Sequence, residues 1–270
     1  MPNNSPLWVY DLETLKGILI SAAKEILLPG LVNVKRRHKA DGSIVTDVDI
    51  AMQQRIAKQL QQHWPDTVFL GEEMSSQAQQ HQLEADRPVW CLDPLDGTSN
   101  FAAGIPCFAI SLALLYQGQI QLGVVYDPMR GELFAAYQNQ GATLNGVALS
   151  LQPSGLALKQ AIGIIDFKRL PEKLAMRIVR EAPYASQRSF GSVALDWCWL
   201  AAGRGHVYIH GKQKIWDYAA GYLIFQEAGG YASTLSGEAV FVNELIPRSA
   251  VAAVDKALFD AWQRWLGIAS

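Results

Sequence analysis

The stretch from Trp90 to Phe101 carries two carboxylates three residues apart, at the end of an apolar run that favours a β-strand. A proline and a glycine within it fix a tight turn, so Asp93 and Asp96 can face one point. The turn also leaves the backbone N–H groups of Gly97 and Thr98 open to an anion. Carboxylates bind Mg²⁺, which takes phosphate oxygens as further ligands. The stretch therefore predicts a joint site for a cation and a phosphate, although a simple turn with side-chain caps has the same pattern.

Three further carboxylates each have a chemical and a structural interpretation. Glu72 follows a short apolar run and a glycine, so it either joins a cation site or lies in a solvated acidic loop. Asp217 falls in the first turn of an apolar helix, where the helix dipole alone favours an acid. Asp49 stands three residues after Thr46, a spacing that also matches a helix capping box. Their chemistry depends on whether the fold brings them to the first two aspartates.

The composition is that of an ordinary folded protein. Among 270 residues, 50% are hydrophobic, and 23 basic against 25 acidic residues give a net charge of −2. This balance excludes a disordered chain and gives no sign of a nucleic-acid or membrane partner. The three cysteines have apolar neighbours and no C-x-x-C spacing, so we expect reduced core residues. Because Met1–Val9 lacks a signal-peptide pattern and no apolar stretch reaches the ~18 residues of a membrane span, we expect a cytoplasmic location.

Apolar spacing in the first half predicts helices followed by an antiparallel meander. A helix runs from Leu12 to Pro29-Gly30, and a second begins at Thr46 and ends at Pro65. A turn is expected at Asp41–Ser43, and the polar composition of Met74–Arg87 predicts an exposed mobile loop. Strands are expected over 67–70, 89–92, 108–116, 120–126 and 133–137.

The second half alternates strands and helices, which places a boundary near residue 150. We therefore expect residues 1–150 to form an α+β subdomain with the metal-binding motifs, and residues 151–270 to form an α/β subdomain that completes the site. Gly229-Gly230 is a plausible end for the helix that contains Asp217. The expected elements are strands over 161–165, 206–209 and 249–254, and helices over 171–181, 193–202, 216–228 and 256–266.

Taken together, these motifs resemble those of the inositol monophosphatase family of Mg²⁺-dependent, lithium-sensitive phosphatases. The resemblance rests on Gly71-Glu72-Glu73, on Asp93-Pro94-Leu95-Asp96-Gly97-Thr98-Ser99-Asn100-Phe101, and on Trp216-Asp217-Tyr218-Ala219-Ala220-Gly221. Order and spacing agree as well, with Val45–Asp49 ahead of them and Glu227–Gly230 behind, so the resemblance spans nearly the whole chain. It implies an α+β fold, the layered αβαβα sandwich of the inositol monophosphatase and fructose-1,6-bisphosphatase type, usually as a homodimer.

The resemblance also implies roles for individual residues. Two or three Mg²⁺ ions would be held by Glu72, Asp93, the Leu95 carbonyl, Asp96 and Asp217. Thr98, with Glu72 or Asp49, would orient the attacking water, and Gly97 and Thr98 would cradle the phosphate. The segment Arg188–Val193 would line the substrate pocket or a dimer contact, with Gly191, Ser192 and Val193 nearest the sugar. Paired metals can activate water and stabilise a leaving alkoxide without a covalent nucleophile.

One departure from the family pattern concerns the substrate. Members that act on inositol phosphate have a glutamate seven residues before the aspartate of the Trp-Asp motif, and here that residue is His210. An imidazole offers at most one acceptor, so His210 is expected to favour a more anionic or simply different alcohol; otherwise it is a partly exposed loop residue. Asn100 favours the inositol phosphate branch over 3′-phosphoadenosine nucleotidases, which typically carry Lys-Glu-Phe where this chain has Ser99-Asn100-Phe101. Fructose 1,6-bisphosphate and histidinol phosphate stay possible substrates.

A different class of function is a catalytically silent relative that binds a phosphorylated ligand and regulates a partner. The presence of every matched acidic residue argues against it. The chain has no Gly-x-Ser-x-Gly elbow, Walker A loop or Gly-x-Gly-x-x-Gly fingerprint, which disfavours serine hydrolases, kinases and dehydrogenases. The sequence therefore predicts a Mg²⁺-dependent phosphomonoesterase for a small phosphorylated polyol, with inositol monophosphate as the leading candidate.

Overall fold

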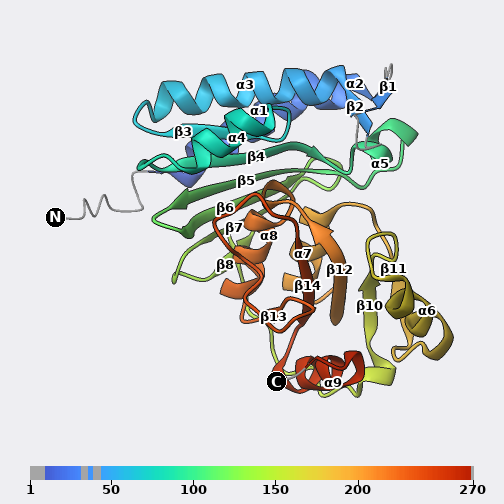
Figure 1. Cartoon of the computed structure of the whole chain (residues 1–270). Helices are drawn as coiled ribbons and strands as arrows, with labels where there is room; N and C mark the ends of the chain where they lie inside the picture. Colours follow the sequence, from blue (N-terminus) through green and yellow to red (C-terminus); the bar gives the residue numbers. More distant parts are fainter. Residues whose placement is uncertain (1–9, 32–35, 39–43, 269–270) are drawn as a thin grey trace.

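Two helices cover one face of a seven-stranded sheet in the computed structural model, which describes residues 10–31, 36–38 and 44–268 (Figure 1). The helices are α1 (Leu12–Ala22), which continues through a π-helical turn (Ala23–Leu27) into α2 (Leu28–Gly30), and α3 (Asp47–His63). The strands, in spatial order, are β3 (Val68–Gly71), β4 (Val89–Asp96), β5 (Ala109–Tyr116), β6 (Gln119–Asp127), β7 (Glu132–Tyr137), β8 (Ala142–Leu144) and β9 (Val147–Leu149). Leu15, Ile56 and Leu112 belong to the apolar layer that joins these helices to the sheet.

Two further helices lie between this sheet and a second one. They are α7 (Val193–Ala201) and α8 (Ile215–Glu227), whose residues are buried nearly throughout. The five strands of the second sheet, in spatial order, are β11 (Ser186–Arg188), β10 (Ile162–Ile165), β12 (Val207–Gln213), β14 (Arg248–Ala253) and β13 (Tyr231–Ser233). The outer helices α6 (Glu172–Glu181) and α9 (Lys256–Leu266) complete the layers (Figure 1). The expected αβαβα sandwich of the α+β class is confirmed.

The remaining elements are short. They comprise the pair β1 (Arg36–His38) and β2 (Ile44–Thr46), the helices α4 (Ser76–Leu83) and α5 (Thr98–Ala103), and a 3-10 turn (Leu158–Gln160). The chain leaves the first sheet at Leu149 and enters the second at Ile162. Because α8 packs on β5 and β6, the second half also covers the first sheet, and the division at residue 150 stays a prediction.

The predicted mobile loop at Met74–Arg87 is wrong, because α4 occupies its centre. The Ser75 hydroxyl accepts from the Ala78 N–H and starts this helix, and Leu83 is buried. The buried Gln79 side chain donates to the carbonyls of Gly71 and Glu72. A polar sequence thus forms a helix because two side chains anchor it to β3.

Most other predicted elements agree with the structure within a few residues. The α8 helix ends with Gly229 at a φ of 96°, as its paired glycines indicated. All three cysteines are buried and free of disulfides. In the described ranges, no helix is long and apolar enough to cross a membrane. The predicted turn at Asp41–Ser43 and the Met1–Val9 segment lie outside the described residues.

Close backbone contact fixes where α8 lies on the first sheet. A side chain at Gly123 on β6 would place its Cβ 2.7 Å from the Ala220 carbonyl oxygen. On the other side, a Cβ at Gly221 would lie 2.7 Å from the Cβ of Trp197 on α7. Small residues therefore let α8 approach both neighbours, which positions the Asp217 carboxylate at its first turn.

We expect Gly123→Ala to lower the free energy of unfolding by about 1–3 kcal/mol, because the added methyl pushes α8 from the sheet. Urea unfolding followed by tryptophan fluorescence measures this change. The control is Gly17→Ala on the exposed face of α1, where no atom lies within 4 Å; it should be neutral or stabilising by about 0.5–1 kcal/mol. Equal effects at the two glycines would contradict this account of the packing.

Candidate active site

A cavity of about 360 Å³ lies where the end of β4 meets the starts of α5, α7 and α8 and strand β12. Eleven of the twelve residues predicted for catalysis, metal binding or substrate binding line it. They are Glu72, Asp93, Leu95, Asp96, Gly97, Thr98, Gly191, Ser192, Val193, His210 and Asp217. The twelfth, Asp49, is buried and contacts Thr98. The structure thus gathers four sequence-distant motifs, while Arg188 does not line the cavity.

Asp96 is held by the second half of the chain. Its Oδ2 accepts from the Ser192 hydroxyl at 2.5 Å and from the Ala194 N–H at 2.8 Å, both at the start of α7. Burial raises the pKa of Asp96 to about 6, and the charge of Glu72 adds to the rise, although these hydrogen bonds oppose it. The N-terminus of α7 therefore holds this carboxylate at the cavity wall.

Asp93 and Asp217 are joined through the first sheet. Asp93 lies opposite Ser111 in the β4–β5 register, and the Ser111 hydroxyl donates to the Trp216 carbonyl at 3.0 Å, beside Asp217. Asp93 Oδ1 accepts from the Leu95 N–H, and Asp217 Oδ2 accepts from the Lys214 N–H, both at 2.9 Å. Burial, then repulsion from Glu72 and Asp96, raises the pKa of Asp217 to about 8 and that of Asp93 well above its usual value.

Glu72 follows β3, which runs parallel to β4, so both strands deliver acids to the same sheet edge. The Glu72 N–H donates to the Leu92 carbonyl at 3.1 Å, and the Gln79 side chain of α4 donates to the Glu72 carbonyl at 3.1 Å. Its charge raises the pKa values of all three aspartates above. Glu72 is therefore a half-buried residue of a turn that lines the cavity, and its role as a metal ligand stays a prediction.

Asp49 both caps α3 and reaches the cavity wall. The capping box is confirmed, since Asp49 Oδ2 accepts from the Thr46 N–H at 2.8 Å and from its hydroxyl at 2.5 Å. Its Oδ1 lies 3.0 Å from the Thr98 hydroxyl, which also lies 2.9 Å from the Leu95 carbonyl. Burial raises the pKa of Asp49, against these hydrogen bonds. Asp49 therefore caps α3 with one carboxylate oxygen and contacts the Thr98 hydroxyl with the other.

The turn before α5 requires glycine. Gly97 has a φ of 92°, and a Cβ there would lie 2.9 Å from the Cys107 carbonyl oxygen. Asn100 in α5 donates to that same carbonyl at 2.8 Å and to the Phe190 carbonyl at 2.6 Å. Asn100 thereby ties α5 to the segment that carries Gly191 and Ser192.

His210 is buried on β12 with 1% exposure, so its interpretation as a partly exposed loop residue is wrong. Its Nδ1 accepts from the Lys212 N–H at 3.2 Å, which places the proton of the neutral ring on Nε2. Nε2 lies 3.3 Å from Asp166 Oδ2 but does not form a regular hydrogen bond with it. Burial would raise the pKa of Asp166, but the contacts with His210 and Arg169 hold it below its usual value.

Five charged residues of the cavity lining were not predicted from the sequence: Asp166, Lys168, Arg169, Asp196 and Lys214. Asp166 directly follows β10, whose parallel pairing with β12 brings it beside His210. Asp196 is buried in the first turn of α7, and its Oδ1 has no hydrogen-bond partner in the described part of the chain. An acid after a strand was a signal available in the sequence for Asp166, whereas Asp196 lies in an apolar run that looks purely structural.

The oxygen-rich lining suits a hard cation. The predicted ligands are carboxylates and one carbonyl, and their mutual repulsion would be relieved by positive charge. Within the described ranges, no three His, Cys, Asp or Glu side chains converge into a ready-made metal cage. Mg²⁺ binds a few carboxylates and keeps several waters, so acids spaced around an open cavity fit it better than a transition metal.

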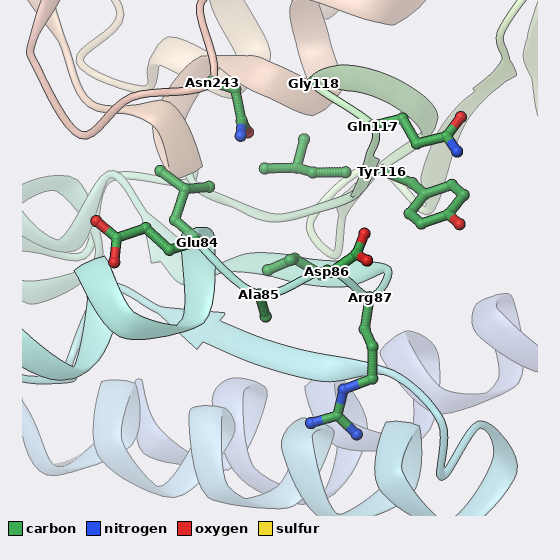
Figure 2. A pocket seen from close by; sticks show the side chains of 11 residues that line it. Glu84, Ala85, Asp86, Arg87, Tyr116, Gln117, Gly118 and Asn243 are labelled. Carbon is green, nitrogen blue, oxygen red and sulfur yellow. The ribbon is translucent and has the colours of Figure 1, made fainter. Parts of the chain in front are cut away.

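A second hollow, of about 270 Å³, lies between the loop after α4 and the β5–β6 turn. Figure 2 shows that the side chains of Glu84, Asp86 and Arg87 spread in different directions, with Asn243 facing them from another segment. No reactive set of groups is assembled there, so the acidic cavity is the candidate active site.

The fold is that of a phosphatase family, and the family model described as "Inositol monophosphatase family" matches residues 11–263. The chain belongs to that family. It is 36% identical over 205 residues to the Nus factor SuhB of Pasteurella multocida, covering 74% of each chain. It is also 36% identical over 237 residues to inositol monophosphatase 1 of Solanum lycopersicum, covering 84% of this chain and 86% of the relative.

Solved structures agree with this assignment. The Bartonella henselae extragenic suppressor protein suhB superposes with a TM-score of 0.82 at 27% identity, covering 94% of this chain and 97% of that one. SaIMPase-II with bound inositol monophosphate has a TM-score of 0.78 at 27% identity, covering 94% and 93%. An IMPase/NADP phosphatase complexed with Mg²⁺ and phosphate gives 0.78 at 26% identity, covering 94% of both chains. The fold is thus one that binds phosphorylated ligands and Mg²⁺ in related proteins.

We expect the metal-free protein to become less stable as the pH rises from 5 to about 8.5. Because the pKa values of Asp96 and Asp217 are raised to about 6 and 8, the folded state binds more protons than the unfolded chain. The stability from these protons is complete below about pH 4 and is lost as the pH passes the raised values. Thermal unfolding in EDTA measures this fall.

Asp217→Asn provides the control, because without this titrating carboxylate the melting temperature in EDTA should fall less steeply with pH. Mg²⁺ binds the ionised carboxylates and should therefore raise the melting temperature more at pH 8.5 than at pH 5. A melting temperature that rises with pH in EDTA, or an identical slope in the variant, would contradict this account.

Proposed function

We propose that this chain is a Mg²⁺-dependent phosphomonoesterase that releases phosphate from small phosphorylated polyols, with inositol monophosphate as the reference substrate. One observation carries the proposal: buried Asp93 and Asp96 and half-buried Asp217 line one cavity with Glu72, and the charge of Lys214 offsets the repulsion at Asp217 only in part. Such a group of like charges lowers the stability of the folded protein, so its presence indicates a functional site. Family membership and a relative complexed with Mg²⁺ and phosphate support the same activity.

In this proposal, Glu72, Asp93, Asp96 and Asp217, with the Leu95 carbonyl, hold two or three Mg²⁺ ions. When bound, the ions supply positive charge to the phosphate and acidify a coordinated water. The first-turn N–H groups of α5, after Gly97, receive a phosphate oxygen.

The other residues position the water and the alcohol. Asp49 fixes the Thr98 hydroxyl, which orients the attacking water. Gly191, Ser192 and Val193 form one wall for the alcohol, and His210 forms the other. Since neutral His210 carries its proton on Nε2, it presents a donor where the family's glutamate presents acceptors.

We also propose a homodimer, lithium sensitivity and a cytoplasmic location. The first two follow from the family resemblance, and the third from three buried, unpaired cysteines. The nucleotide, fructose bisphosphate and histidinol phosphate alternatives use the same carboxylates, so they differ from the reference substrate only in the alcohol. A phospholigand-binding regulator without turnover is the alternative outside enzymes.

Phosphate release by the purified protein tests the proposal. The substrates are inositol 1-phosphate, fructose 1,6-bisphosphate, histidinol phosphate and 3′-phosphoadenosine 5′-phosphate, each with Mg²⁺, with EDTA and with added lithium. Release that requires Mg²⁺ and falls with lithium is expected for at least one of them. Binding of these compounds without any release would reject the phosphatase and favour the regulator.

We expect Asp93→Asn to reduce turnover at least about a hundredfold, because it removes a charged ligand of the metal site. The same change should raise the melting temperature of the metal-free protein, since it removes a repelled, buried charge. The exposed Asp260→Asn on α9 is the control and should alter neither turnover nor melting temperature. Near-normal turnover in Asp93→Asn would reject this ligand assignment.

We expect His210→Glu to shift preference toward inositol 1-phosphate, because a carboxylate accepts hydrogen bonds from ring hydroxyls. The new acid would face Asp166, so the double variant with Asp166→Asn should show the shift more clearly, and Asp166→Asn alone is the control. Ratios of kcat/KM across the substrate panel measure the shift. An unchanged profile in both His210 variants would show that this position does not contact the alcohol.

A further inference from the structure

We propose that the alcohol part of the substrate carries a second anionic group, which Lys168 and Arg169 bind at the rim of the cavity. The inference rests on the proposed function and narrows its substrate class to phosphorylated polyols with another phosphate or a carboxylate. Nothing in the metal or phosphate chemistry described above uses these two residues. Their position beside the alcohol wall formed by His210 is what connects them to specificity.

The two basic side chains line the cavity without a salt bridge to its acids, although the charge of Arg169 helps to lower the pKa of Asp166. Both are exposed, and neither forms an ion pair with any described residue, although six acidic residues line the same cavity. The nearest acid in the chain, Asp166, has its carboxylate turned to His210 Nε2 and to the Arg169 backbone N–H. The basic groups are therefore available to a ligand anion.

The turn that carries them is fixed against β12. The Asp166 N–H donates to the Ile209 carbonyl at 3.1 Å, and the Leu170 N–H donates to the Phe167 carbonyl at 3.3 Å. A Cβ at Gly211 would lie only 1.7 Å from the Arg169 carbonyl oxygen, so the turn rests directly on that glycine. A backbone held in place presents its charges at a lower entropic cost on binding than a free loop does.

Two residues of the cavity lining, His210 and Asp196, each carry a buried polar atom without a regular partner in the described ranges. His210 Nε2 and Asp196 Oδ1 line the cavity on side chains that are 1% and 4% exposed, and neither has a regular hydrogen-bond partner in the described ranges. Burial, and then the charges of Asp96 and Asp166, raise the pKa of Asp196 well above its usual value. A polyol that spans from the metal side to the turn would meet a donor and an acceptor for its hydroxyls on the way.

Charge balance favours a substrate with an additional anion over a neutral alcohol. A second phosphate entering a cavity lined by six acids would be repelled unless cations met it, and Lys168 and Arg169 provide two. An uncharged inositol ring needs neither of them. The pair therefore distinguishes between substrates that share the same reacting phosphate.

Matched substrate pairs test the inference with Mg²⁺ present: inositol 1-phosphate against inositol 1,4-bisphosphate, and fructose 1-phosphate against fructose 1,6-bisphosphate. The native protein should prefer the bisphosphate of each pair. In Lys168→Gln and Arg169→Gln, kcat/KM for the bisphosphates should fall about tenfold each, mainly through KM, and clearly less for the monophosphates. Lys159→Gln and Arg180→Gln are controls, since both residues are exposed and lie outside the cavity.

Calorimetric binding of the same four compounds separates this inference from the proposed function. If phosphate is released but both members of each pair respond equally to the Lys168 and Arg169 variants, the inference is wrong and the phosphatase stands. If no compound is hydrolysed, the phosphatase is wrong; tighter binding of the bisphosphates that is lost in the two variants would then still support the second-anion site. Equal binding of the members of each pair would overturn it.

Discussion

Mutual repulsion among buried carboxylates is the constraint on which the rest of this structure depends. Asp93 and Asp96 are almost completely withdrawn from water, Asp217 is half-buried beside them, and Glu72 adds its charge to theirs. Hydrogen bonds from backbone N–H groups offset part of this cost, with donors at the starts of α7 and α8 and at the irregular end of β4. The strand ends and helix starts are therefore arranged around charges that only a cation fully compensates.

That arrangement needs close packing between layers far from the cavity. The small residues Gly123 and Gly221 let α8 approach its neighbours, and the Ser111 hydroxyl joins its first turn to the first sheet. On the opposite wall, Gly211 allows the 166–170 turn to rest on β12. Close packing at these glycines thus determines where the acidic and the basic side chains of the cavity lie.

Apolar periodicity predicted most helices and strands, and strand-end acids predicted a joint cation and phosphate site, because both are local signals. The five-layer arrangement came from the family resemblance of the motifs. It could not predict α4, since only Gln79 and Leu83 of that polar helix are buried and no apolar period marks it. Nor could the sequence show that His210 is buried, because the glycine that follows it suggests a loop. In the structure, Gly211 is a glycine because the Arg169 carbonyl packs against it. Lys168 and Arg169 reach the cavity through tertiary contacts alone, which leave no trace in local spacing.

The two hydrogen bonds to Asp96 have a consequence for the order in which the site forms during synthesis of the chain. Its two hydrogen-bond donors, Ser192 and Ala194, emerge from the ribosome about a hundred residues after it. Until then, the growing chain holds Glu72, Asp93 and Asp96 without α7 or α8 to support them. In the proposed phosphatase, the cation site would therefore form only after α7 and α8 have been made, so a chain that stops before α7 would lack the stability that the cation supplies.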